Sequence, residues 1–227
     1  MDVFSEFSQI AVLLGEPARI LMLWHLLGGE IRPASELAFL ANVSPQSASM
    51  HLSKLVDAGM LTVSKKGRNR FYSITRAEVA NVVESIAALL PSAQKAFNFP
   101  KSHKPDFHLA RSCYDHLAGK FAVELAETLQ NQNILMIEKD EFVLTETGKV
   151  WFSEFGIDID SLKNQRRVFA KKCLDWSERK YHIAGALGAV LLQELLKRKW
   201  FALSEGRTLR LTLEGRKKLN LLFGIRK

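Results

Sequence analysis

The sequence has only two cysteines and no long apolar run. Two cysteines in 227 residues are too few for a disulfide framework, and in a reducing compartment they are thiols or metal ligands. The longest apolar stretch, residues 183–192, includes two glycines and falls well short of the roughly 18 residues that span a membrane. The N-terminus also lacks the positive flank and apolar core of a secretory signal. These absences predict a cytoplasmic protein.

Motifs of common enzyme classes are also missing. No GxGxxG follows an expected strand, and neither a phosphate loop nor a zinc-protease HExxH occurs. A Cys-His hydrolase built on Cys113 and His116 would lack an oriented third group and an oxyanion site. The sequence therefore predicts a protein that is not an enzyme.

The composition is that of a globular chain with a basic excess. Hydrophobic residues make up 47% and charged residues 25%, and 227 residues fit two small domains better than one. The 32 basic residues exceed the 24 acidic ones, and the net charge of +8 favours nucleic acid as a partner. Residues 1–100 hold nine basic and eight acidic side chains, whereas residues 101–227 hold 23 and 16. We interpret the second excess as a solvated face, with contact to flanking phosphates as the alternative.

Helical spacing dominates the first 60 residues. Apolar residues between positions 13 and 27 predict two helices, and a short third helix follows Pro33. Ser44 can cap a fourth helix that ends at Gly59. One face of this helix is apolar, with Ala48, Leu52, Leu55 and Val56. The other face is mostly small and neutral, which suits a DNA major groove; it carries Gln46, Ser47, Ser49, Met50, Ser53 and Lys54.

A basic hairpin follows the fourth helix. Residues 60–64 and 70–74 alternate as two strands around a turn that contains Gly67 and Asn69. Its tip has four cations within six residues, namely Lys65, Lys66, Arg68 and Arg70. Because such a tip can contact phosphates, the whole pattern predicts a winged helix-turn-helix that binds double-stranded DNA. A protein-docking module that uses the winged helix as scaffold is the alternative.

Residues 35–74, SELAFLANVSPQSASMHLSKLVDAGMLTVSKKGRNRFYSI, resemble the DNA-binding core of the ArsR/SmtB bacterial repressors, and the resemblance covers about residues 8–90. It implies a homodimer joined through the first helix and the helix at about residues 76–90. That helix has an apolar stripe without local cover, made of Val79, Val82, Val83, Ile86, Ala87 and Leu90.

The resemblance and the residue types together predict the DNA contacts. The bases would be read by Gln46, Ser47, Ser49 and Met50, and the phosphates would be held by Lys54, Lys65, Lys66, Arg68 and Arg70. Ser44 belongs to the same expected interface. His51 could read a base, contact a phosphate or fill the helix interface.

Metal-sensing members of the resembled family often carry paired cysteines in the third helix, or an Asp and His set along the dimerisation helix. Here the third helix has no cysteine and the last helix of the domain has no histidine. Neither site carries over, so we expect any effector to be sensed elsewhere.

The second half repeats itself after a proline-containing linker at residues 91–105. Matching segments, such as Leu144-Thr145-Glu146 and Leu211-Thr212-Leu213, recur at offsets of 66 to 68 residues. Each copy reads as a long helix, a hairpin and a closing helix. The expected fold is therefore mainly α with small β-hairpins. A winged helix-turn-helix domain (1–90) precedes a C-terminal domain (106–227) of two tandem winged-helix-like repeats, about 113–157 and 173–225.

A Cys-x-Asp motif stands ahead of each expected long helix. As a metal or metalloid sensor, the set would be Cys113, Asp115, His116, Cys173, Asp175 and His182. As a redox switch, the two thiols would form a disulfide. We favour a third interpretation, in which each motif is a helix start, the cysteines are small core residues, and the aspartates cap helices or pair with Arg111, Arg179 or Lys180. The sequence as a whole predicts a homodimeric transcriptional repressor, released from its operator by a ligand, metal or oxidant.

Overall fold

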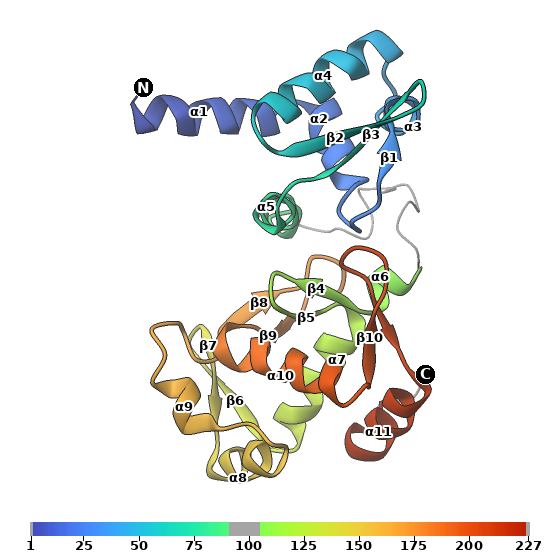
Figure 1. Cartoon of the computed structure of the whole chain (residues 1–227). Coiled ribbons are helices and arrows are strands. Elements are labelled where there is room, and N and C mark those ends of the chain that lie inside the picture. Colours follow the sequence, from blue (N-terminus) through green and yellow to red (C-terminus); the bar gives the residue numbers. More distant parts are fainter. Residues whose placement is uncertain (1, 91–104, 226–227) are drawn as a thin grey trace. The chain divides into compact units, whose positions relative to one another are not determined.

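The computed structural model describes residues 2–90 and 105–225, which fall into two compact units (Figure 1). The first holds the described residues up to Leu89, and the second holds Leu90 and the described residues from Pro105 onward. None of the described helices is long and apolar enough to cross a membrane. The expected linker at residues 91–105 lies outside the described residues, except that Pro105 already begins a helix.

The first unit has the element order of a winged helix. Its elements are α1 (Val3–Leu14), α2 (Pro17–Trp24), β1 (Arg32–Pro33), α3 (Ala34–Leu40), α4 (Pro45–Asp57), β2 (Leu61–Lys66), β3 (Asn69–Ile74) and α5 (Ala77–Ala88). The strands form an antiparallel sheet in the order β1-β3-β2, in which the short edge strand β1 was not predicted. Helices α2, α3 and α4 pack around Met22, Leu37 and Leu52, which are fully buried. The expected winged helix-turn-helix fold is confirmed.

Helix α4 begins and ends as its sequence predicts. The Ser44 hydroxyl accepts a hydrogen bond from the Ser47 amide at 3.2 Å, and Pro45 occupies the first turn, where no donor is needed. Gly59 follows the helix with φ of 67°, a left-handed conformation that favours glycine. These local signals fix the start and direction of the helix that carries most of the expected base-reading residues.

The second unit shows one order of elements twice: hairpin, long helix, hairpin and closing helix. The first series is β4 (Arg111–Cys113), β5 (His116–Ala118), α7 (Lys120–Asn131), β6 (Leu135–Glu138), β7 (Glu141–Leu144) and α8 (Glu146–Glu154). The second series is β8 (Lys172–Leu174), β9 (Tyr181–Ile183), α10 (Gly185–Lys197), β10 (Phe201–Leu203), β11 (Leu209–Leu211) and α11 (Leu213–Phe223). Helices α6 (Pro105–Leu109) and α9 (Ile159–Lys163) precede the two series. This order supports the internal repeat, which stays a prediction.

The two closing helices begin with the same local structure. Thr145 caps α8 by accepting a hydrogen bond from the Gly148 amide at 2.9 Å, and Thr212 caps α11 through the Gly215 amide at 2.9 Å. A Cβ at either glycine would lie 2.0 Å from a backbone carbonyl oxygen. Only glycine therefore lets each helix approach its preceding hairpin this closely.

The two series share one hydrophobic core. The first hairpin of each series packs against the long helix of the other series. Strand β5 packs against α10 of the other series, β9 packs against α7, and β5 and β9 are neighbours. The facing sides of α7 and α10 supply Phe121, Leu125, Leu129, Leu187, Leu191 and Leu195 to the core. The exchange places the β4–β5 and β8–β9 hairpins next to each other.

Candidate functional site

The exposed face of α4 carries the expected base-reading residues. Gln46, Ser49 and Met50 are exposed to solvent, and half of the Met50 surface is accessible. Ser47 is half-buried, and its amide is engaged in the cap. The buried face holds the apolar stripe, with Leu52 and Leu55 fully enclosed. The helix therefore offers small polar groups and one thioether outward, a surface that can approach base edges without charge repulsion.

The β2–β3 hairpin forms a basic wing. Its strands pair from Leu61 opposite Ile74 to Lys66 opposite Asn69, and Lys65 lies directly opposite Arg70. The side chains of Lys65, Lys66, Arg68 and Arg70 are all exposed, and none has an ion-pair partner among the described residues. Adjacent like charges repel one another in water, so a phosphate backbone that neutralises them is a favourable partner.

His51 does not belong to the exposed face, which corrects its inclusion among the expected DNA contacts. Only 7% of its surface is accessible, and its Nδ1 lies 3.4 Å from a guanidinium nitrogen of Arg19. Arg19 is itself buried and donates to the carbonyls of Val12 and Leu13, where α1 ends. The pair ties α4 to the α1–α2 junction. A signal was present, because His51 lies three residues after the buried Ala48, on the same helical face. The role of Arg19 had no sequence signal.

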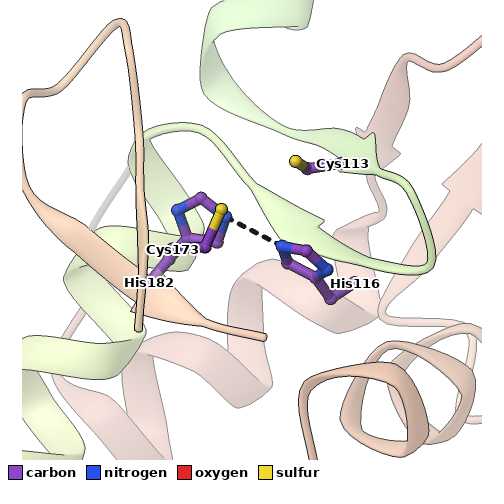
Figure 2. Close-up of side chains that lie close together, drawn as sticks. All are labelled: Cys113, His116, Cys173 and His182. Atoms are coloured by element: carbon purple, nitrogen blue, oxygen red, sulfur yellow. Dashed lines mark hydrogen bonds between the residues drawn. The ribbon is translucent and has the colours of Figure 1, made fainter. Parts of the chain in front are cut away.

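The second candidate site is a Cys-His cluster made of Cys113, His116, Cys173 and His182. Cys113 lies directly opposite His116 in the β4–β5 hairpin, and Cys173 lies directly opposite His182 in the β8–β9 hairpin. Figure 2 shows the four side chains, two from each hairpin, gathered around one centre. Their four candidate ligand atoms lie within 4.8 Å of one another, and the two imidazole Nε2 atoms are 3.2 Å apart. The histidines are buried and the cysteines are half-buried.

This geometry corrects the interpretation of Cys-x-Asp as a helix start. Both cysteines lie on strands, and the long helices begin later, at Lys120 and Gly185. The cysteines are 60 residues apart whereas the histidines are 66 apart, because the loop of the second hairpin is six residues longer. The repeat offset therefore aligned the histidines rather than the two Cys-x-Asp motifs, and this was the available signal.

Asp175 lies behind His182 rather than within the Cys-His cluster. Its Oδ2 accepts hydrogen bonds from Arg111 at 3.0 Å and from the Gly119 amide at 2.7 Å, and lies 3.7 Å from His182 Nδ1. Burial alone would raise the pKa of this carboxyl, but the positive charge of Arg111, together with His182 and hydrogen bonds from Ser177 and Gly119, holds the pKa well below its usual range. Asp175 is therefore a buried anion. The expected pairing of Asp175 with Arg111 is found.

Asp115 has the corresponding place beside His116. Its Oδ1 lies 3.4 Å from His116 Nδ1, and both of its oxygens accept hydrogen bonds from Arg167, at 2.6 and 3.2 Å. Partial burial raises the pKa of this carboxyl, but the Arg167 guanidinium outweighs burial and the pKa is lowered. The expected six-residue metal set thus divides into four converging ligand candidates and two carboxylates that contact their imidazoles. Arg167 had no place in the sequence prediction.

Arg111 supports this arrangement from inside the unit. The sequence indicates it only as one of three possible partners of the two aspartates. Arg111 is 1% exposed, and its guanidinium lies 4.8 Å from the centre of the Trp176 ring and 5.4 Å from that of Phe107. A pocket of about 300 Å³ adjoins the Cys-His cluster and is lined by His116, Arg167 and Cys173, among others. The Asp175 carboxylate beside the cluster is therefore held by a buried side chain, and the pocket gives access to the cluster.

Comparisons with known proteins agree with the fold of the first unit. The Helix-turn-helix domain family matches residues 14–64. The HTH-type transcriptional regulator YdfF of Bacillus subtilis (strain 168) is 42% identical over 212 residues, which cover 93% of this chain and 94% of that protein. A "Probable mercury resistance operon repressor" of Streptomyces lividans is 36% identical over 70 residues, 31% of this chain and 55% of that protein.

Among solved structures, the homodimeric winged helix-turn-helix DNA-binding domain Mb0332 from Mycobacterium bovis is similar, with a TM-score of 0.34 and 20% identity. The match covers 37% of this chain and 77% of that one. The chain belongs to the helix-turn-helix transcriptional regulators, since its similarity to the Bacillus subtilis regulator extends over nearly all of both proteins. It is a DNA-binding regulator whose N-terminal domain is a winged helix-turn-helix.

Proposed function

We propose that this helix-turn-helix regulator is a homodimeric repressor, which binds its operator through α4 and the wing and is released by a ligand, metal or oxidant sensed in its second unit. The observation that carries the proposal is the coincidence of two surfaces in one unit. The exposed face of α4 is mostly neutral, and the hairpin that follows it has four exposed cations. A neutral face can approach base edges, and a basic hairpin can bind phosphates.

The α4 surface suits sequence reading. Gln46 can form a bidentate pair with an adenine, and Ser47 and Ser49 can donate to or accept from either kind of base pair. Met50 supplies an apolar contact for a thymine methyl group. Ser44 and Lys54, both exposed near opposite ends of the helix, would hold phosphates and so fix the depth of the helix in the groove.

The dimer is proposed from two apolar helix faces that the described residues leave uncovered. No residue of α1 is buried, and Phe4 and Phe7 are 78% and 72% exposed. Val82 and Ile86 on α5 and Leu89 just after it are also exposed, whereas Val79 and Val83 pack inward. Covering such faces releases about 25 cal/mol per Å² of apolar surface. A second copy would cover both, and two α4 helices would then enter successive major grooves about 34 to 36 Å apart.

We propose an effector site in the second unit because the first unit lacks metal-ligating cysteines and histidines at the two expected positions. Helix α3 has no cysteine and α5 has no histidine. Among the described residues, the Cys-His cluster is the group of metal-ligating side chains that lies close enough to hold an ion. An effector acts only if it binds one dimer geometry better than the other.

A gel-shift series with the full chain tests the proposal. We expect a duplex from the promoter region of the protein's own gene to be retarded, with an affinity that falls steeply between about 50 and 200 mM salt. Sedimentation of the free protein should give the mass of two chains. Absence of any retention at low salt would contradict operator binding by this chain and favour the protein-docking alternative. If the protein is a monomer and still shifts the duplex, only the proposal of a dimer is contradicted.

A further inference from the structure

We infer that the Cys-His cluster is a binding site for one thiophilic divalent cation of the zinc or cadmium type. Two thiolates and two imidazoles form the ligand set that such ions prefer in tetrahedral geometry. The inference concerns the second unit alone and does not depend on DNA binding. It replaces the interpretation of the two cysteines as small core residues, since both lie half-buried at a shared centre.

The distances fit a four-coordinate ion. With metal–nitrogen bonds of about 2.0 to 2.1 Å, two nitrogens of a tetrahedral site lie about 3.3 Å apart, and two sulfurs at about 2.3 Å from the ion lie about 3.8 Å apart. The two Nε2 atoms are 3.2 Å apart, and all four ligand atoms lie within 4.8 Å. The distance between the two nitrogens thus already fits a bound ion. The longest distance between two ligand atoms must shorten by about 1 Å.

The orientation of the imidazoles is the strongest argument. For both Nε2 atoms to bind an ion, each ring must carry its proton on Nδ1, which then needs an acceptor. Each Nδ1 faces a carboxylate, that of Asp115 at 3.4 Å and that of Asp175 at 3.7 Å. Metal-ligating histidines almost always donate their other N–H to a carboxylate, carbonyl or water. At His116 the carboxylate is within hydrogen-bond distance, whereas the buried His182 Nδ1 has no hydrogen-bond partner among the described residues and the Asp175 carboxylate lies 3.7 Å away, so a small closing movement would complete the second contact.

Both carboxylates are held in place by cations that lie outside the ligand set. Asp175 is fixed by Arg111 and the Gly119 amide, and Asp115 by the two-pronged contact with Arg167. Two thiolates balance the charge of a divalent ion, and these two ion pairs balance themselves. The site would therefore bury no uncompensated charge.

The cluster also has an entry path and a structural consequence. The 300 Å³ pocket reaches Cys173 and His116 from the surface, so an ion can enter without unfolding of the unit. Once bound, it would join two hairpins of three-residue strands that come from different series. Because an ion that binds only the folded unit stabilises it by mass action, metal and stability are coupled.

Cobalt and zinc titrations of the reduced, chelator-treated full chain test the inference. We expect one Co²⁺ per chain, with the visible absorption of a tetrahedral thiolate complex, and displacement of Co²⁺ by Zn²⁺. Zn²⁺ should also slow modification of both thiols by a disulfide reagent. This second measurement needs no substitution, so it decides the matter even if a variant fails to fold.

Variants locate the ion. Cys113→Ser and Cys173→Ser should each weaken Zn²⁺ binding by more than about 100-fold, and Asp115→Asn by about 10- to 100-fold, because it removes only the support of His116. His108→Gln is the matched control, since this histidine lies in the same unit outside the cluster; it should leave binding unchanged.

Three results would overturn the inference. Equal thiol reactivity with and without Zn²⁺ would return the cysteines to a structural role. Full Zn²⁺ affinity in the Cys113→Ser, Cys173→Ser double variant would place the ion elsewhere. Failure of the reduced chain to bind either metal, together with rapid formation of a Cys113–Cys173 disulfide under mild oxidation, would make the pair a redox switch instead.

Discussion

The wing of the first unit and the β6–β7 hairpin of the second are similar elements with opposite chemistry. Each follows a helix and has an exposed tip, but residues 65–70 carry four cations whereas residues 138–141 read Glu-Lys-Asp-Glu. An acidic tip is repelled by phosphates. A winged-helix-like outline therefore does not by itself make a DNA contact. Side-chain charge decides which hairpin can bind phosphates.

The two units also differ in where their functional groups lie. The first presents its polar and basic residues on the surface, as a rigid partner such as a duplex requires. The second turns two thiols and two imidazoles inward, toward one another. Variants of the two units should therefore differ: those of the first unit should affect DNA binding, and those of the second should affect ion binding and stability.

The largest expected effect is on the stability of the second unit. Arg111→Met leaves the Asp175 carboxylate buried without its cation, which should lower the free energy of unfolding of that unit by about 3 to 5 kcal/mol. Denaturant unfolding followed by circular dichroism, in chelator, measures the change. Glu127→Ala is the control, because it removes the exposed partner of Lys180 and should leave the transition in place. Equal behaviour of the two variants would contradict the role given to Arg111.

Next in size is the loss of the wing. Replacing Lys65, Lys66, Arg68 and Arg70 with alanine should weaken operator binding by on the order of 100-fold and reduce the salt slope by about three to four units. Arg68→Ala alone should reduce the slope by about one unit. Binding as a function of salt measures both.

The matched control for the wing replaces Arg216, Lys217 and Lys218, three cations of α11 in the second unit. If that face is only solvated, the salt slope stays the same. A drop in slope equal to that of the wing variant would show that the second unit lies along the DNA, and the contrast between the units would fail.

The two sites should be coupled in the intact protein. We expect Zn²⁺ or Cd²⁺ to change operator affinity by about 5- to 150-fold, the usual range for coupled sites. The Cys113→Ser, Cys173→Ser double variant should bind the operator yet lose this response. Gel shifts with metal and with chelator provide the measurement. If metal binds but operator affinity stays constant, the ion is a structural component and the effector lies elsewhere.

Within α4, exposed and buried residues should behave differently. Gln46→Ala should relax preference at one base pair by about 1 to 3 kcal/mol without lowering stability. His51→Ala should instead lower stability, because it removes the buried contact with Arg19, and leave base preference intact. Binding to a panel of single-base-pair operator variants, together with thermal unfolding, distinguishes the two. Altered base preference in the His51 variant would restore it to the reading face.

The smallest effect concerns the two closing helices. Thr145→Ala and Thr212→Ala each remove a capping hydroxyl and should each cost about 1 kcal/mol of stability. Denaturant unfolding of both variants gives the two values. If the two series are a true repeat, the losses should agree; a loss at only one helix would argue against their equivalence.

Local sequence signals predicted the first unit well, because its elements are set by neighbouring residues. The Ser44 cap, the apolar stripe of α4 and the turn at Gly67 each act within a few residues. The prediction for His51 remained open because a polar residue at the edge of an apolar stripe can face either way. Only its contact with Arg19, 32 residues away in the sequence, decided the matter.

The residue pattern was enough to predict the winged helix, the basic wing, the lack of cysteine in α3 and of histidine in α5, and the six residues from which the Cys-His cluster was drawn. It placed Cys113 and Cys173 at helix starts, however, because a three-residue strand carries little periodic signal. Tertiary structure alone decided that Cys113 faces His116, that Cys173 faces His182, and that both pairs meet. The reason is physical: strand register and the exchange of hairpins between two series depend on long-range packing, which local residue patterns do not record.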